Sequence, residues 1–184
     1  MRKGWIFLIT GLAIITLLSC YKNGDDLYFP EADQHIYFQY EYINYAWGYQ
    51  HYGWLIDSTG KVFCYHNPEN WNFPDSLGFI NTSDMDSNIS ETDSICYKID
   101  IRKLNDKTEL IFNASKGKIS EPVHEMYDAG GSVYSAFLYN KNTGKYKKIL
   151  LKQEGDFRIE NSSTEADELY TWLKSVNYLI NTTE

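Results

Sequence analysis

The chain has 184 residues, a formal net charge of −8 and an aromatic content of 16%. An acidic chain lacks the basic stripe that binds a phosphate backbone, so nucleic acid is excluded as an expected partner. The aromatic content is too high for a disordered protein, and the length suits one domain after a short leader. The chain is therefore expected to fold as a single unit.

The first twenty residues have the pattern of an export signal. Arg2 and Lys3 form a basic leader, residues 5–18 carry no charge, and the small Ser19 precedes Cys20. A basic start, an apolar run and a small residue at the cut are typical of a secretory signal. The apolar run is shorter than the ~20 residues that cross a bilayer core, so a permanent membrane helix is not expected.

The segment Leu17-Leu18-Ser19-Cys20 resembles the lipobox of bacterial lipoproteins. This resemblance implies removal of the signal, diacylglycerol and a further fatty acid such as palmitate on Cys20, and attachment to the outer membrane. The periplasmic or cell-surface face is left undecided. The alternative is an ordinary signal that is cut near Ser19 and leaves Cys20 free. The whole chain also resembles uncharacterised envelope lipoproteins of gut-type Gram-negative bacteria, a resemblance that implies no activity.

These features divide the chain into three parts. Residues 1–19 are the expected signal peptide, residues 20–34 the lipidated N-terminal tether, and residues 35–184 a single α+β domain. The membrane is thus an expected partner through the lipid anchor, because two or more acyl chains attach a protein stably.

Residues 35–66 are predicted to form strands. A strand over 35–46 shows apolar and aromatic residues at period two. Two further strands over 51–56 and 61–66 flank the turn at 57–60, whose Asp and Gly favour a hairpin. Residues 67–93 show no regular pattern, and a loop of this length is functional, mobile, or a sign of a missed element.

The second half of the chain predicts two helices and a second hairpin. Apolar residues at helical spacing indicate a helix over 101–116, and strands over 132–140 and 145–153 form the hairpin, followed by a short strand over 157–160. A capping box at 162–165 starts the last helix, which carries a long apolar stripe. The expected fold is α+β, with a mostly antiparallel sheet of about five to six strands and two helices packed on one face.

Cys64 and Cys96 remain once Cys20 is lipidated. An even pair in an oxidising envelope is a candidate disulfide. Two buried free thiols are an equally acceptable interpretation, because free cysteine is among the most buried residue types.

Aromatic residues are concentrated between positions 37 and 73. Flat rings stack on sugars, and the polar tips of Tyr and Trp meet hydroxyl groups, so a glycan or peptide platform is one hypothesis. The alternative is that the aromatics form the two faces of a sheet, where they are favoured cross-strand partners. The candidate ligand-binding residues are Trp47, Tyr49, Tyr52, Trp54 and Trp71.

Metal and catalytic signatures are weak. His51 and His66 fall across the predicted hairpin, but a metal site needs three or four ligands and a one-residue slip puts them on opposite faces. The segment that starts at Asp84 resembles an EF-hand loop, yet the required Gly and final Glu are absent. No cofactor, metal site or catalytic residue is predicted.

Three hypotheses of function follow. The first is a non-enzymatic envelope lipoprotein that binds a glycan, a peptide or an envelope protein. The second is a small hydrolase of envelope or extracellular polymers, which predicts two acids that converge in a cleft. The third is a structural or assembly subunit of an outer-membrane complex, which predicts a large exposed apolar patch.

Overall fold

The computed structural model describes residues 33–182. The expected signal over residues 1–19, the lipidated Cys20 and most of the tether over residues 20–34 lie outside the described residues. Within residues 33–182, no helix is long and apolar enough to cross a membrane.

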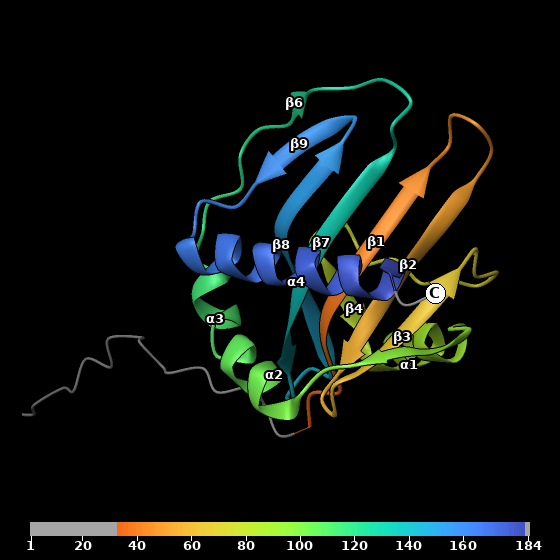
Figure 1. Cartoon of the computed structure of the whole chain (residues 1–184). Helices are drawn as coiled ribbons and strands as arrows, with labels where there is room; N and C mark the ends of the chain where they lie inside the picture. The colour runs from red at the N-terminus through yellow and green to blue at the C-terminus, as the bar shows by residue number, and fades with distance from the viewer. Residues whose placement is uncertain (1–32, 183–184) are drawn as a thin grey trace, which may run out of the picture.

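Nine strands form one sheet, and all its strand pairs are antiparallel. The order is β5-β3-β2-β1-β7-β8-β9-β6, with β4 also paired to β8 (Figure 1). The α+β class and the antiparallel pairing are confirmed, but the sheet exceeds the predicted five to six strands because β4, β5 and β6 are too short to show alternation. The strands are β1 (Ile36–Asn44), β2 (Gln50–Asp57), β3 (Lys61–His66), β4 (Phe79–Asn81), β5 (Ser94–Lys98), β6 (Val123–His124), β7 (Gly131–Asn140), β8 (Lys145–Gly155) and β9 (Phe157–Glu160).

The helices differ from the prediction in number and position. The predicted helix over 101–116 is two helices, α2 (Ile101–Thr108) and α3 (Ile111–Ala114). A bond from the Leu110 N–H to the Lys107 carbonyl, of i→i−3 type, tightens the end of α2. The polar segment 81–93, expected as part of a loop, contains α1 (Thr82–Ser90).

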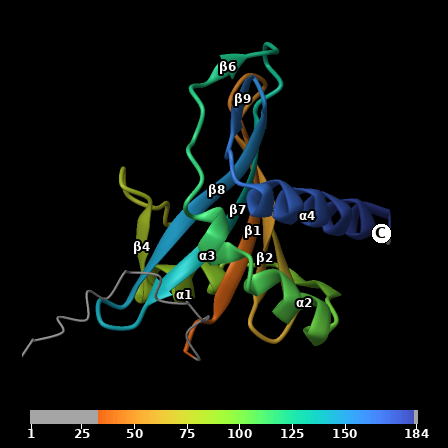
Figure 2. The same ribbon diagram turned by 90° about the vertical axis from the view of Figure 1, so that its left-hand side faces the viewer.

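Helices cover both faces of the sheet rather than one (Figure 2). We call the face under α2, α3 and the C-terminal helix α4 (Thr164–Thr182) the helix face. The opposite face, covered by α1 and by residues 67–78, is the loop face. The helices predicted over 101–116 and after residue 162 do pack on one face, but α1, which is too polar to show an apolar stripe, was not predicted and covers the other.

The main core lies between the helix face and α4. The predicted stripe of α4 is buried at Ala166, Leu169, Leu173 and Val176, whereas Leu179 is exposed. The ring of Trp172 packs edge-on against Phe38, with their centroids 5.0 Å apart. Each large apolar side chain buried in this way contributes about 1.5–3 kcal/mol.

A second, smaller core lies on the loop face. Its buried side chains come from five strands and α1: Ile36, Leu55, Ile80, Met85, Phe137 and Tyr146. Asn88 of α1 is 2% exposed, and its side-chain amide donates to the Asn72 carbonyl at 2.8 Å. The Asn72 N–H in turn donates to Asn88 Oδ1 at 2.7 Å. These reciprocal bonds hold residues 67–78 against the sheet.

Cys64 and Cys96 form a disulfide, with their Cα atoms 5.8 Å apart. The bridge joins β3 to the edge strand β5 and resolves the choice between a disulfide and two free thiols. It closes a loop with a sequence separation of 32 residues. A loop of this size contributes on the order of 3 kcal/mol through the unfolded state.

The sheet has two ends, which the positions of the described chain distinguish. The described chain starts at one of them, the entry end, where the buried Gln34 donates from Nε2 to the carbonyls of Ile36 and Phe137 at 2.8 and 2.7 Å. β1 then crosses the sheet, and residues 45–49 form the tip of the β1–β2 hairpin at the opposite end, the hairpin end (Figure 1).

Candidate functional site

The candidate aromatic residues do not form one platform, because side chains alternate between the two faces of a strand. Trp54 lies on the helix face, is 2% exposed and belongs to the main core. Its Nε1 donates to Asn177 Oδ1 of α4 at 3.0 Å. Trp54 therefore has no surface from which it could bind a ligand.

Tyr52 also lies on the helix face, beyond the edge of α4. Its ring stacks on Tyr42, with centroids 4.6 Å apart and planes at 28°, and on His66, with centroids 6.2 Å apart and planes at 13°. Tyr42 and His66 are its neighbours across the two flanking strand pairs. The ring is thus a cross-strand partner on both sides, and its faces are not free to stack on a sugar.

Trp71 is half-buried on the loop face. It packs on Tyr65, with ring centroids 4.1 Å apart, and meets His51 edge-on at 5.4 Å. Trp71 acts as a cover for buried polar side chains of the sheet.

The remaining candidates lie at the hairpin end. Trp47 is 78% exposed, Tyr45 73% and Tyr49 47%. Asn44 positions this tip: its Oδ1 accepts from the Ala46 N–H at 2.8 Å, and its Nδ2 donates to the Asp128 carbonyl at 3.1 Å. A buried amide therefore fixes the backbone of the tip that carries these exposed rings.

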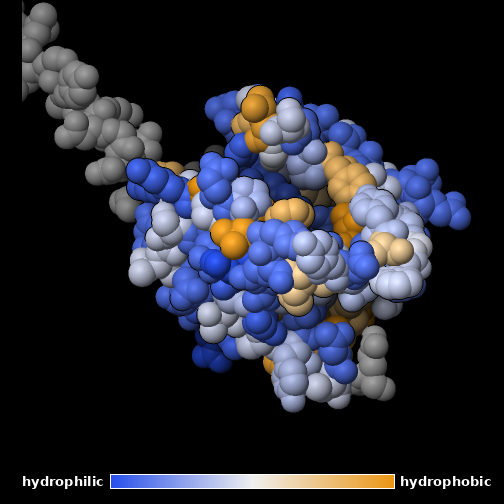
Figure 3. Space-filling model, turned by 90° about the horizontal axis from the view of Figure 1, so that it is seen from above, coloured by the Kyte–Doolittle hydropathy of each residue, from blue (hydrophilic) through white to orange (hydrophobic). Residues whose placement is uncertain are grey.

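A hollow of about 430 Å³ lies beside this tip. Its floor on the loop face is formed by Ile43 and Val133, with Gln153 next to them and the rings of Tyr45 and Phe157 at the rim. Figure 3 looks down on the molecule from this end, where hydrophobic side chains lie in patches among hydrophilic ones. We call Tyr45, Trp47, Tyr49 and this hollow the hairpin-end surface.

Close backbone contacts shape the hollow. Gly130 has φ +68°, and a Cβ there would lie 2.6 Å from the Ile43 carbonyl oxygen. Gly155 has φ +117°, and a Cβ there would lie 2.1 Å from the Gly130 carbonyl oxygen. Both positions require glycine, since any side chain would push β7 away from its neighbours.

A buried charged cluster lies directly below the hollow on the loop face. Glu41 Oε2 accepts from Lys148 Nζ at 3.1 Å, and Glu41 Oε1 lies 3.1 Å from His51 Nε2 and 3.3 Å from Gln39 Nε2. An ionised carboxylate only accepts, which assigns a proton to His51 Nε2. His51 is fully buried, and its Nδ1 has no hydrogen-bond partner.

Burial and neighbouring charges act oppositely on Glu41. Burial raises the pKa of its carboxyl group, but Lys148 and the bond from His51 outweigh burial and lower the pKa to about 2. Burial, together with the nearby Glu41, raises the pKa of the Tyr65 hydroxyl well above its ordinary value. Glu41 is therefore a buried anion at neutral pH, with its oxygens occupied by Lys148, His51 and Gln39.

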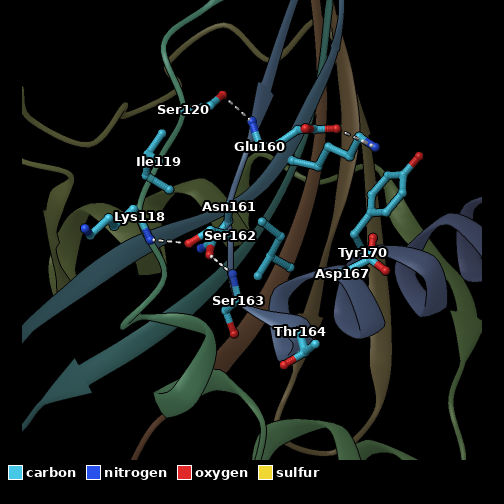
Figure 4. A pocket seen from close by; sticks show the side chains of 12 residues that line it. Lys118, Ile119, Ser120, Glu160, Asn161, Ser162, Ser163, Thr164, Asp167 and Tyr170 are labelled. Carbon is cyan, nitrogen blue, oxygen red and sulfur yellow. Dashed lines mark hydrogen bonds and ion pairs between the residues drawn. The ribbon is translucent and has the colours of Figure 1, made fainter.

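A further hollow, of about 520 Å³, lies beside the start of α4 (Figure 4). Its acids are Glu160 and Asp167. Glu160 is ion-paired with Lys152 at 3.4 Å and with Arg158 at 3.0 Å, which does not suit a general acid that must hold a proton at neutral pH. The first turn of α4 is capped from within, since Ser163 Oγ accepts from the Glu165 N–H at 3.2 Å.

The two histidines of the hairpin do not converge. Tyr52 is the register partner of His66, so His51 and His66 lie on opposite faces. Among residues 33–182, no three His, Cys, Asp or Glu side chains are grouped to hold a metal ion. Asp84 lies in α1 rather than in a calcium-type loop.

Comparisons with protein-family models, curated proteins and solved structures found no match. The arrangement of the side chains therefore carries the functional argument. The charged cluster around Glu41 was not predicted; the signal was present as Gln39 and Glu41 alternating with tyrosines in β1, a pattern that also fits a solvent-exposed face.

Proposed function

We propose that this chain is an envelope lipoprotein, attached to the outer membrane through Cys20, whose domain binds a protein or peptide partner with the hairpin-end surface. One observation carries the proposal: three exposed aromatic side chains lie at the tip of the β1–β2 hairpin, and one of them, Tyr45, lines a hollow that also contains Ile43 and Val133. This tip is at the end of the sheet opposite the start of the described chain. Exposed Tyr and Trp are the side chains most enriched among residues that dominate binding energy.

A peptide fits this surface better than a glycan does. The floor residues Ile43 and Val133 are apolar, and Gln153 supplies a hydrogen-bonding amide at their side. Such a hollow accepts an apolar side chain of a partner, whereas a sugar would leave hydroxyl groups unpaired against the floor. The hydrolase is less well supported, since Glu160 of the hollow beside α4 is already ion-paired with Lys152 and Arg158.

The anchor is tested by mass spectrometry of the protein purified from its native membrane. The N-terminal peptide is expected to begin at Cys20 and to carry a diacylglycerol group, because the lipobox-like segment places the cut before that residue. A peptide that begins at Met1, or a processed peptide without fatty acid, contradicts the anchor.

The partner site is tested with a photoreactive amino acid at position 47 in intact cells. A discrete protein adduct is expected at position 47 and not at Tyr178, an aromatic residue of α4 with a similar exposure (69%, against 78% for Trp47). With the partner identified, Trp47→Ala should weaken its binding at least about thirtyfold, as for a residue worth 2 kcal/mol. Equal adducts at both positions, or an adduct that is carbohydrate, would contradict the proposal.

A further inference from the structure

Basic side chains gather at the entry end, although the chain as a whole is acidic. They come from the start of β3, the end of β5, the first turn of α2 and the β7–β8 turn with the strand that follows (Figure 1). We call the following set the basic end: Lys61, Lys98, Arg102, Lys103, Lys141, Lys145 and Lys147.

Some of these cations have acidic neighbours. Lys141 pairs with Asp33, and Arg102 lies 3.8 Å from Asp100. Lys145 and Lys147 together contribute to a lowered pKa of Asp75, whose main cause is the bond from the Phe79 N–H. Asp57 is engaged in its own turn, where Oδ1 accepts from the Thr59 and Lys61 N–H groups.

Not every cation of this end is held in an ion pair. Within residues 33–182, Lys61, Lys98, Lys103 and Lys145 make no ion pair, and all four are exposed. Lys61 and Lys98 are register partners across β3 and β5. Like charges directly opposite each other destabilise a sheet, and an anion bound between them would relieve that repulsion.

The position of the basic end relative to the anchor indicates which kind of anion these lysines bind. Twelve residues, 21–32, separate Cys20 from Asp33, where the described chain begins at this same end. A short tether keeps the basic end close to the bilayer that holds Cys20. Basic residues beside an anionic bilayer each strengthen attachment about fivefold, and Ile101, 45% exposed beside Arg102, adds an apolar contact.

We propose that the basic end docks on anionic phospholipid headgroups of the membrane that holds the anchor. The inference rests on the proposed lipidation of Cys20 and gives the domain an orientation. In this orientation the strands run outward from the bilayer. The hairpin-end surface then lies at the end of the domain far from the lipid, where a partner can reach it.

The test uses the purified lipidated protein in vesicles of phosphatidylcholine alone or mixed with phosphatidylglycerol. Lysines are labelled with an amine-reactive reagent, and the extent of labelling at each lysine is measured by mass spectrometry. Labelling of Lys103 is expected to fall at least about fivefold in the anionic vesicles and to recover at about 1 M salt, where the Debye length is about 3 Å. Lys118, outside the basic end, should label equally in both.

Two matched variants separate this surface from general charge. In Lys61→Gln/Lys98→Gln/Lys145→Gln, protection of Lys103 by anionic vesicles should be lost. The control variant Lys116→Gln/Lys118→Gln/Lys174→Gln removes three positive charges outside the basic end. In this variant the protection of Lys103 by anionic vesicles should persist. Equal labelling of Lys103 in both lipids, or equal protection in both variants, overturns the proposal.

The anchor and the orientation fail in different ways. If the N-terminal peptide carries no lipid, the proposed function fails, and co-sedimentation of the unlipidated protein with phosphatidylglycerol vesicles still decides whether the basic end binds them. If the peptide is lipidated and Lys103 is unprotected, only the orientation fails.

Discussion

Replacing Lys148 by methionine is expected to lower the free energy of unfolding by about 3–5 kcal/mol, because it leaves Glu41 as an uncompensated buried anion. The Glu41 side chain is 7% exposed and that of Lys148 is 16% exposed, so water replaces the lost partner poorly. Chemical denaturation monitored by the tryptophans measures the effect. Lys145→Met on the same strand, where the side chain is exposed, should change the stability by less than about 0.5 kcal/mol.

The double variant Glu41→Gln/Lys148→Met tests whether the lost stability comes from the unpaired charge of Glu41 or from other contacts of Lys148. With neither charge present, much of the lost stability should return, because no ion is left buried without a counterion. If Lys148→Met is as stable as the parent protein, the pair is solvated and the cluster is not a buried one.

The Glu41 cluster also makes the free energy of unfolding fall at acidic pH. The pKa of the Glu41 carboxyl group is about 2 in the fold, against an ordinary value of 4.5. A lowered folded pKa contributes stability above the unfolded pKa, and this contribution is lost as the pH falls from about 4.5 towards 2. The loss is on the order of 3 kcal/mol. Glu41→Gln should show a shallower fall over this range in denaturation curves measured at successive pH values.

Replacing Trp54 by alanine is expected to lower the free energy of unfolding by about 3–5 kcal/mol, the usual cost of removing a large core aromatic. The side chain is 2% exposed, and its loss also leaves Asn177 Oδ1 without the indole donor. Thermal or chemical denaturation measures the change. The matched variant is Trp47→Ala, which should leave stability within about 0.5 kcal/mol while it removes partner binding.

The variants of these two tryptophans distinguish an aromatic residue that binds a partner from one that packs in the core. Near-parental stability for Trp54→Ala would contradict its place in the core. A strong destabilisation by Trp47→Ala would mean that the hairpin tip supports the fold rather than a partner.

Local sequence patterns were sufficient to predict those elements that are fixed by contacts among neighbouring residues. The turn at 57–60 is closed by the side chain of its own Asp57, so the hairpin could be predicted from adjacent residues. The apolar stripe likewise defines α4 from nearby residues. The predicted capping box at 162–165 is not formed as such: Ser163 accepts from the Glu165 N–H, while Ser162 accepts from the N–H of Lys118.

Local pattern failed where a distant contact decides the structure. α1 has no side-chain cap and a mostly polar sequence, but Met85 enters the loop-face core and Asn88 binds the backbone of Asn72. In β1, Glu41 alternates with tyrosines as an exposed residue would. Its burial follows from the cover of the loop face by Trp71 and residues 67–78, and its charge is compensated by Lys148, 107 residues away.

The sequence by itself determined the antiparallel α+β class, both hairpins and the final helix, because turns, caps and periodicity act over a few neighbouring residues. It also marked Cys20 as the residue that resembles a lipid attachment site. Only the tertiary structure decided which aromatics are core and which are surface, since that depends on which strand face is covered by segments far away in the chain. The same long-range packing created the buried Glu41 cluster and brought the lysines of the basic end together.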